Sequence, residues 1–114
     1  MAIKLKRVYE EPAKTDGIRI LVDRLWPRGL TKEEARVDLW LKEVAPSTAL
    51  RKWFAHDPAK WPEFKARYKA ELKNNAPQLA LLKRAITRGP ATLVYGAKDT
   101  EHNEAIVLQD LLSH

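Results

Sequence analysis

Residues 17–29 read GIRILVDRLWPRG, and the rest of the chain is organised around this stretch. Residues 18–22 form a nearly continuous apolar run with β-branched members, which is typical of a strand buried on both faces. Pro27 has no N–H to donate to a neighbouring strand, and Gly29 permits a sharp turn, so the strand has ended by Trp26. The stretch therefore predicts a buried strand that leads into a charged, aromatic corner.

A second apolar run at residues 91–95, ATLVY, predicts another buried strand, with an exit loop at 96–100. Residues 3–9 begin by alternating lysines with apolar side chains and predict a third strand. Residues 37–41 alternate in the same way, which favours an extended segment with two distinct faces. A helix that continues from Lys32 is the open alternative for that last segment.

Helix start and stop signals separate these runs. A capping box at residues 31–34, a capping Ser47, and Asp57 followed by Pro58 each begin a helix. A break at residues 74–77 starts a further helix, which ends before a Gly-Pro pair. The last helix is expected to run from about residue 101 to residue 112, and its apolar composition requires cover on most sides.

Buried strands separated by helices indicate an α/β fold. We therefore predict a single layered domain over residues 1–114, with a small, mainly parallel sheet flanked by helices. In parallel α/β sheets, ligands bind beyond the carboxyl ends of the strands. Here those ends lie at residues 23–29, 42–47 and 95–103, which is also where polar residues concentrate.

The composition narrows the class of function. The chain has no cysteine, which excludes disulfides, thiolate metal sites and cysteine nucleophiles. No apolar run approaches the ~20 residues of a membrane span, and residues 1–10 have no signal-peptide pattern, so we expect a cytoplasmic location and no membrane partner. The net charge of +6 favours anionic partners, although a generic basic surface would give the same value.

The first group of candidate site residues follows the opening strand and comprises Asp23, Arg24, Trp26 and Arg28. Arginine presents a planar fork of donors that matches carboxylate and phosphate groups, and the stiff Trp-Pro turn aims Arg28. Trp26 offers a stacking surface for a ring or a nucleobase. The structural alternative is that Asp23 and Arg24 pair with each other and Trp26 belongs to the core.

A second group stands at the end of the 37–41 segment. If that segment is extended, Trp40 and Lys42 share one face with Asp38, which suits either a site wall or an exposed sheet edge. Arg51 lies off the apolar face of its predicted helix and becomes an anion contact if that helix lines the cleft.

A third group follows the run at 91–95 and comprises Tyr95, Lys98, Asp99, His102 and Asn103. Lys98 supplies a positive charge, and His102 can move a proton near neutral pH. A helix that begins near residue 100 would add backbone donors for an anion. The alternative is that Asp99 or Thr100 only caps this helix and His102 faces solvent.

These positions give one set of predicted site residues. Candidate catalytic residues are Asp23 and Asp99; candidate ligand-binding residues are Arg24, Trp26, Arg28, Trp40, Lys42, Ser47, Arg51, Tyr95, Lys98 and Asn103. The three histidines lack metal-ligand spacing, so no metal site is predicted. No Gly-rich phosphate loop or other cofactor motif is present, so no cofactor is predicted.

Three functions remain open on this evidence. The leading one is a pocket for a phosphate-bearing metabolite or a nucleotide, with or without catalysis. The second is a nucleic-acid-binding module, with Lys65, Lys69 and Lys73 as a stripe that contacts the phosphate backbone. The third is a protein-interaction domain without chemistry, which would present an exposed apolar patch. The oligomeric state stays undetermined.

Three long motifs occur in order along the chain: DGIRILVDRLWPRG, then DLWLKEVAPS followed by LRKWFAHDP, then TLVYGAKD followed by HNEA. Over essentially the whole chain this pattern resembles the YeaO-like family of small bacterial proteins, a branch of a larger group of domains of unknown function. The resemblance implies an α/β domain of cytosolic type and no established activity. Family motif positions on this chain include Asp23, Arg24, Trp26, Pro27, Arg28, Gly29, Trp40, Lys42, Ala45, Pro46, Ser47, Leu50, Arg51, Trp53, Arg67, Tyr68, Lys98, Asp99 and Asn103.

Overall fold

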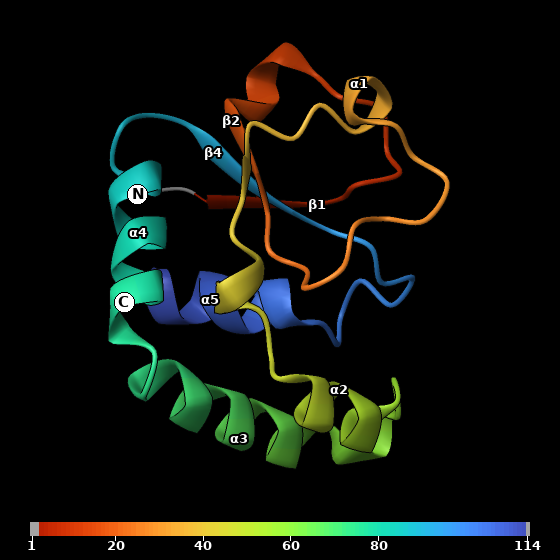
Figure 1. The fold of residues 1–114 in the computed structure, drawn as a ribbon, viewed down its shortest axis with the longest axis vertical. Helices are drawn as coiled ribbons and strands as arrows, with labels where there is room; N and C mark the ends of the chain where they lie inside the picture. The colour runs from red at the N-terminus through yellow and green to blue at the C-terminus, as the bar shows by residue number, and fades with distance from the viewer. Residues whose placement is uncertain (1–2, 114) are drawn as a thin grey trace.

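The computed structural model describes residues 3–113, so residues 1, 2 and 114 of the predicted domain lie outside the described residues (Figure 1). A four-stranded sheet has the order β1–β4–β2–β3, and every pair in it is parallel. The strands are β1 (Ile3–Arg7), β2 (Ile18–Leu21), β3 (Leu39–Trp40) and β4 (Ala91–Tyr95). The predicted α/β class is confirmed.

The two predicted buried strands form the centre of the sheet. Every residue of β4 is buried, and β4 pairs with β1 on one side and with β2 on the other. Because successive side chains of a strand point to opposite faces, burial of the whole strand requires cover on both faces. The polar loops that follow β2 and β4 therefore begin at the same edge of the sheet.

The 37–41 segment is extended, as its alternation predicts, but its ladder is short. β3 contains only two residues, while the N–H of Asp38 donates to the carbonyl of Arg19 and that of Leu41 to Leu21. The helical alternative is wrong, because helix α1 (Lys32–Ala35) ends at Arg36, whose φ of 48° is left-handed.

The larger helices cover one face of the sheet. They are α2 (Thr48–Phe54), α3 (Trp61–Lys73), α4 (Ala76–Ile86) and α5 (Glu104–Leu112), with short 3₁₀ segments η1 (Lys14–Asp16), η2 (Lys42–Val44) and η3 (Pro58–Lys60). Helix α5 packs against β1 and β4 and lies between the sheet and α3 (Figure 1). The predicted caps at Thr31, Ser47 and Asp57 are all present, since each side chain accepts a backbone hydrogen bond.

Helix α5 begins three residues later than its sequence suggests. Asp99 accepts hydrogen bonds from the N–H groups of Glu101 and His102, so it holds a turn of its own ahead of the helix. Asn103 is the helix cap, and its side chain accepts from the N–H of Ile106 at 3.1 Å. The expectation of helix donors near residue 100 is therefore wrong, because helical backbone starts only at Glu104.

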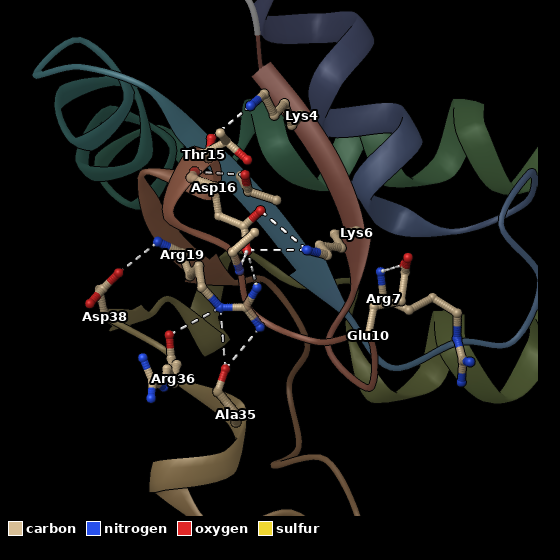
Figure 2. Close-up of polar contacts among 12 residues, drawn as sticks. Lys4, Lys6, Arg7, Glu10, Thr15, Asp16, Arg19, Ala35, Arg36 and Asp38 are labelled. Atoms are coloured by element: carbon tan, nitrogen blue, oxygen red, sulfur yellow. Dashed lines mark hydrogen bonds and ion pairs between the residues drawn. The ribbon is translucent and has the colours of Figure 1, made fainter.

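The opposite face of the sheet combines a small apolar cluster with a buried ion pair. Asp16 and Arg19 are 4% and 3% exposed, and their charged groups lie 2.7 Å apart (Figure 2). Arg19 also donates to the carbonyls of Ala35 and Arg36, and Lys6 lies 3.3 Å from Asp16. This network explains how a charged residue can interrupt the otherwise apolar β2 strand. Among residues 3–113, no helix is long and apolar enough to cross a membrane.

Candidate ligand-binding cavity

A cavity of about 500 Å³ opens at the carboxyl ends of β2 and β4. Its walls come from the loop after β2, the segment before α2, helix α2 itself, and the loop that joins β4 to α5. Six of the predicted site residues line it: Asp23, Arg24, Trp26, Arg28, Arg51 and Asn103. Parallel topology brings these distant segments together, as strand-end reasoning predicts.

Arg24 holds two walls of this cavity together. Its guanidinium donates to the carbonyls of Pro46 and Ala45, each at 3.1 Å, and lies 3.7 Å from the carboxylate of Glu43. The ion pair of Arg24 is thus with Glu43 and not with Asp23, which was the structural alternative. Arg24 therefore positions the loop after β2, because its guanidinium binds two backbone carbonyls of the facing segment.

Trp26 also has a structural role. Its ring nitrogen donates to the carbonyl of Leu30 at 2.7 Å, and its ring meets that of Trp40 edge-on at 5.5 Å between centroids. The Trp40 ring nitrogen donates to the backbone carbonyl of Asp23 at 2.7 Å. The two tryptophans therefore fix the shape of the corner, and only Trp26 also borders the cavity.

Three cations are available to a ligand in the cavity. The side chains of Arg28 and Lys52 make no hydrogen bond or ion pair within residues 3–113, and both are exposed. Arg51 extends from α2, and its charge acts on Glu104 across the cavity. Tyr9 donates its hydroxyl to the backbone carbonyl of Arg28 at 2.9 Å, which anchors the loop that carries this arginine.

Glu104 is the acidic wall residue that sequence reasoning missed. Burial and a hydrogen bond with the side chain of Asp23, together with the negative charge of Asp23, raise the pKa of Glu104 well above its ordinary value; Arg51 opposes this shift weakly. A glutamate at the first position of a helix ordinarily indicates only a favourable helix dipole. The signal that could have found it is its place on a helix that starts beside the strand ends.

Asp23 and Glu104, hereafter the carboxyl pair, are held from several elements. The N–H of Gly96 donates to the Asp23 carboxylate at 2.7 Å. A Cβ at position 96 would stand 3.0 Å from the same oxygen, so glycine permits this close approach. Because its pKa is raised, Glu104 keeps its proton in a pH range where an exposed glutamate is ionised, so Glu104 adds no negative charge to the cavity in that range.

Asp99 lies outside the cavity wall but orients a residue that borders it. Its carboxylate lies 2.9 Å from Nδ1 of His102, and hydrogen bonds from the N–H of Glu101 and from His102 lower the pKa of Asp99. The His102 ring packs edge-on against Trp61 at 5.3 Å. Asp99 therefore acts through His102 and does not reach the cavity itself.

The remaining predicted site residues are elsewhere or have structural partners. Ser47 caps α2 and donates its hydroxyl to Glu71 at 2.6 Å. Burial raises the pKa of Tyr95, whose side chain is 3% exposed and hydrogen bonds to Asn103. Lys42 lies 5.3 Å from the Trp40 ring centroid, and Lys98 is exposed outside the cavity lining.

The lysine stripe on α3 is partly engaged with its own chain. Lys69 lies 3.7 Å from Asp110, and Lys65 lies 5.7 Å from the centroid of the Trp61 ring.

In the described part of the chain, no group of three or more histidine, aspartate or glutamate residues is arranged to hold a metal ion.

Comparison with known proteins gives a family but no activity. A family model described as "Inactive DUF488-N3 subclade" matches residues 2–114. The chain is 45% identical over 112 residues to "Uncharacterized protein YeaO" of Escherichia coli, which covers 98% of this chain and 97% of that protein. It is 41% identical over 111 residues to an uncharacterized protein of Mycobacterium tuberculosis, covering 97% and 93% of the two chains. No solved structure matches this chain.

Proposed function

Because this chain belongs to the YeaO-like family, whose matching model describes an inactive DUF488-N3 subclade, we propose that it binds a small phosphate-bearing molecule without turning it over. The ligand occupies the cavity at the carboxyl ends of β2 and β4. Its phosphate lies against Arg28 and Arg51, with Lys52 adding positive charge at the cavity wall.

One observation carries this proposal. Two arginines from separate elements, Arg28 after β2 and Arg51 on α2, line one cavity. Neither guanidinium forms a hydrogen bond or ion pair within residues 3–113, although Arg51 is attracted to Glu104. Guanidinium groups whose donors are unused in a concave site are suited to a phosphate, since each can form paired, charge-assisted hydrogen bonds.

The size of the cavity supports a small molecule over a polymer. Small-molecule pockets span about 300–1,000 Å³, and the cavity of about 500 Å³ lies inside that range. Its wall also includes Trp26, Phe54 and Phe64, which can cover an apolar part of a ligand. Exposed Tyr9 and Leu25 stand at the same cavity, where they add apolar contact area.

The test is a titration with inorganic phosphate followed by amide chemical shifts. We expect the shifts to cluster at residues 23–29, 51–56 and 96–104. Arg28→Ala and Arg51→Ala should each weaken binding about tenfold or more, because a hydrogen bond to a charged group contributes about 1.5–3 kcal/mol. Arg84→Ala is the matched control, since Arg84 is an exposed arginine on α4 away from the cavity. Shifts that are scattered over the surface, or equal losses in all three variants, would refute the proposal.

Acid–base catalysis is a second candidate that the carboxyl pair favours. Two neighbouring carboxyl groups, one held protonated, are the arrangement that many acid–base enzymes use. Its test is ³¹P NMR of phosphate esters incubated with the protein and with Asp23→Asn. Conversion of a phosphate ester by the protein but not by Asp23→Asn would show that the protein catalyses a reaction and does not only bind its ligand.

A further inference from the structure

We propose that the ligand is a phosphate ester of a polyhydroxyl compound, a sugar phosphate or a nucleotide, whose hydroxyl groups are bound by Asp23 and Glu104. This inference rests on the proposed function and names the part of the ligand that the phosphate contacts leave undefined. It starts from the carboxyl pair, which no phosphate group would require and which shares the cavity with Arg28 and Arg51.

The carboxyl pair is built rigidly. The N–H of Gly96 binds one Asp23 oxygen at 2.7 Å, and the ring nitrogen of Trp40 binds the Asp23 backbone carbonyl at 2.7 Å. Glu104 begins α5 directly after Asn103, a cap that is 2% exposed. Two carboxyl groups held in place before a ligand arrives lose little conformational entropy on binding, so their hydrogen bonds can contribute to specificity.

A hydroxyl group matches this pair better than a phosphate or an ammonium group does. Asp23 and Glu104 line the cavity with carboxyl groups, which offer mainly acceptor oxygens, and a hydroxyl is a donor that brings no charge. A phosphate oxygen placed there would meet a negative charge. An ammonium group would add a cation to a cavity that already contains Arg28, Arg51 and Lys52.

The cavity has room for both ends of such a molecule. Its volume of about 500 Å³ exceeds what a phosphate ion fills, and its wall carries the cations and the carboxyl pair together. Trp26, Phe54 and Phe64 supply apolar surface for the C–H face of a sugar or for a base. A sugar phosphate carries a phosphate and hydroxyl groups on one small molecule, so its phosphate can meet the cations while its hydroxyl groups meet the carboxyl pair.

The experiment compares affinities by calorimetry and chemical-shift titration for five probes. They are inorganic phosphate, ribose 5-phosphate, 2-deoxyribose 5-phosphate, adenosine 5′-monophosphate and phosphoethanolamine. We expect ribose 5-phosphate to bind about tenfold more tightly than inorganic phosphate, since one or two hydrogen bonds to the carboxyl oxygens contribute that difference. The affinities of adenosine 5′-monophosphate and ribose 5-phosphate are then compared. Tighter binding of the first indicates a nucleotide ligand, and tighter binding of the second indicates a free sugar phosphate.

Glu104→Ala is the decisive variant. It should reduce the ratio of the ribose 5-phosphate affinity to the inorganic phosphate affinity to about one, because the hydroxyl contacts are lost. Any effect of the missing Glu104 on Arg51 acts on both ligands alike and cancels in this ratio. Glu104→Gln keeps a hydrogen-bonding side chain and should retain part of the preference. If Glu104→Ala does not fold, Asp23→Asn provides the same comparison.

The outcomes separate this inference from the proposed function. Phosphate binding that depends on Arg28, without tighter binding of ribose 5-phosphate, overturns the hydroxyl assignment and leaves the proposed function in place. Tighter binding of phosphoethanolamine than of ribose 5-phosphate, or an unchanged preference in Glu104→Ala, also overturns it. If neither inorganic phosphate nor any phosphate ester binds, both proposals are wrong.

Discussion

At the scale of one residue, the buried charge of Arg19 depends on a single carboxylate for its neutralisation. Asp16 neutralises Arg19 at 2.7 Å, and both are almost fully buried on the face of the sheet that carries α1. Asp16→Asn should lower the free energy of unfolding by about 3 kcal/mol, because the guanidinium stays buried without its counter-charge. Urea unfolding measures the loss, with exposed Glu33→Gln as the control. A loss no larger than that of the control would contradict it.

The pH dependence of that effect has a defined sign. Burial raises the pKa of Asp16, but hydrogen bonds from Ala13, Arg19 and Lys6 outweigh it, so the pKa is lowered overall. A carboxylate whose pKa is lowered by folding stabilises the fold at pH values above 3.8, the pKa of this aspartate in the unfolded chain. That stabilisation is lost as the pH falls from 3.8 through the lowered pKa of the folded protein. Unfolding measured from pH 7 down to pH 2 should therefore show a shallower acid loss for Asp16→Asn than for the wild type.

The contribution of Glu104 to stability depends on pH with the opposite sign. The pKa of Glu104 is raised above the ordinary glutamate value of 4.5, so its contribution to stability becomes less favourable as the pH rises from 4.5 towards the raised value. Among the groups that face it, Asp23 reinforces the shift and Arg51 opposes it. Glu104→Gln cannot ionise and should gain stability over the wild type at pH 7–8 but not at pH 4. Thermal unfolding at both pH values tests this, and an equal difference at the two would refute it.

At the scale of elements, Ser47 connects two helices and lies outside the lining of the cavity. Its side chain caps α2, and both its N–H and its hydroxyl donate to the carboxylate of Glu71 on α3. Ser47→Ala should cost about 1–2 kcal/mol, because the cap is lost and Glu71 loses a half-buried donor. Thr48→Ala, at an exposed first helical position, is the control. Chemical unfolding measures both, and phosphate binding should be the same in both variants.

Local chemistry explains which elements could be predicted and which could not. The caps at Thr31, Ser47 and Asp57 follow from three- or four-residue motifs, and the burial of β2 and β4 follows from their apolar runs. The sequence predicts too early a start for α5, because Asp99 caps a separate turn and such a turn has the same sequence pattern as a helix start. Glu104 was missed because its partner, Asp23, lies far away in the sequence and is brought close only by the parallel topology.

At the scale of the whole molecule, the net charge of +6 makes weak nucleic-acid binding at low salt expected and uninformative by itself. What distinguishes a nucleic-acid module from a small-molecule protein is how the affinity responds to salt and which residues carry it. A surface that contacts 6–10 phosphates loses about 10³–10⁵ in affinity between 50 and 200 mM salt. The α3 lysines are the candidates for such a surface, and Lys69 already lies beside Asp110.

We therefore expect a single-stranded oligonucleotide to bind weakly at about 50 mM salt and not measurably at about 200 mM. A phosphate ester in the cavity should lose less affinity over the same range, because salt screens contacts in a concave site less than those of an open surface. Lys65→Ala combined with Lys73→Ala should weaken the oligonucleotide and leave the phosphate ester unchanged; Arg28→Ala should do the reverse. Fluorescence anisotropy and calorimetry on the same samples measure the two. Oligonucleotide binding that remains measurable at about 200 mM salt and is lost with the two lysines would establish α3 as a nucleic-acid surface, because the weak binding of a generic basic surface is lost over that range.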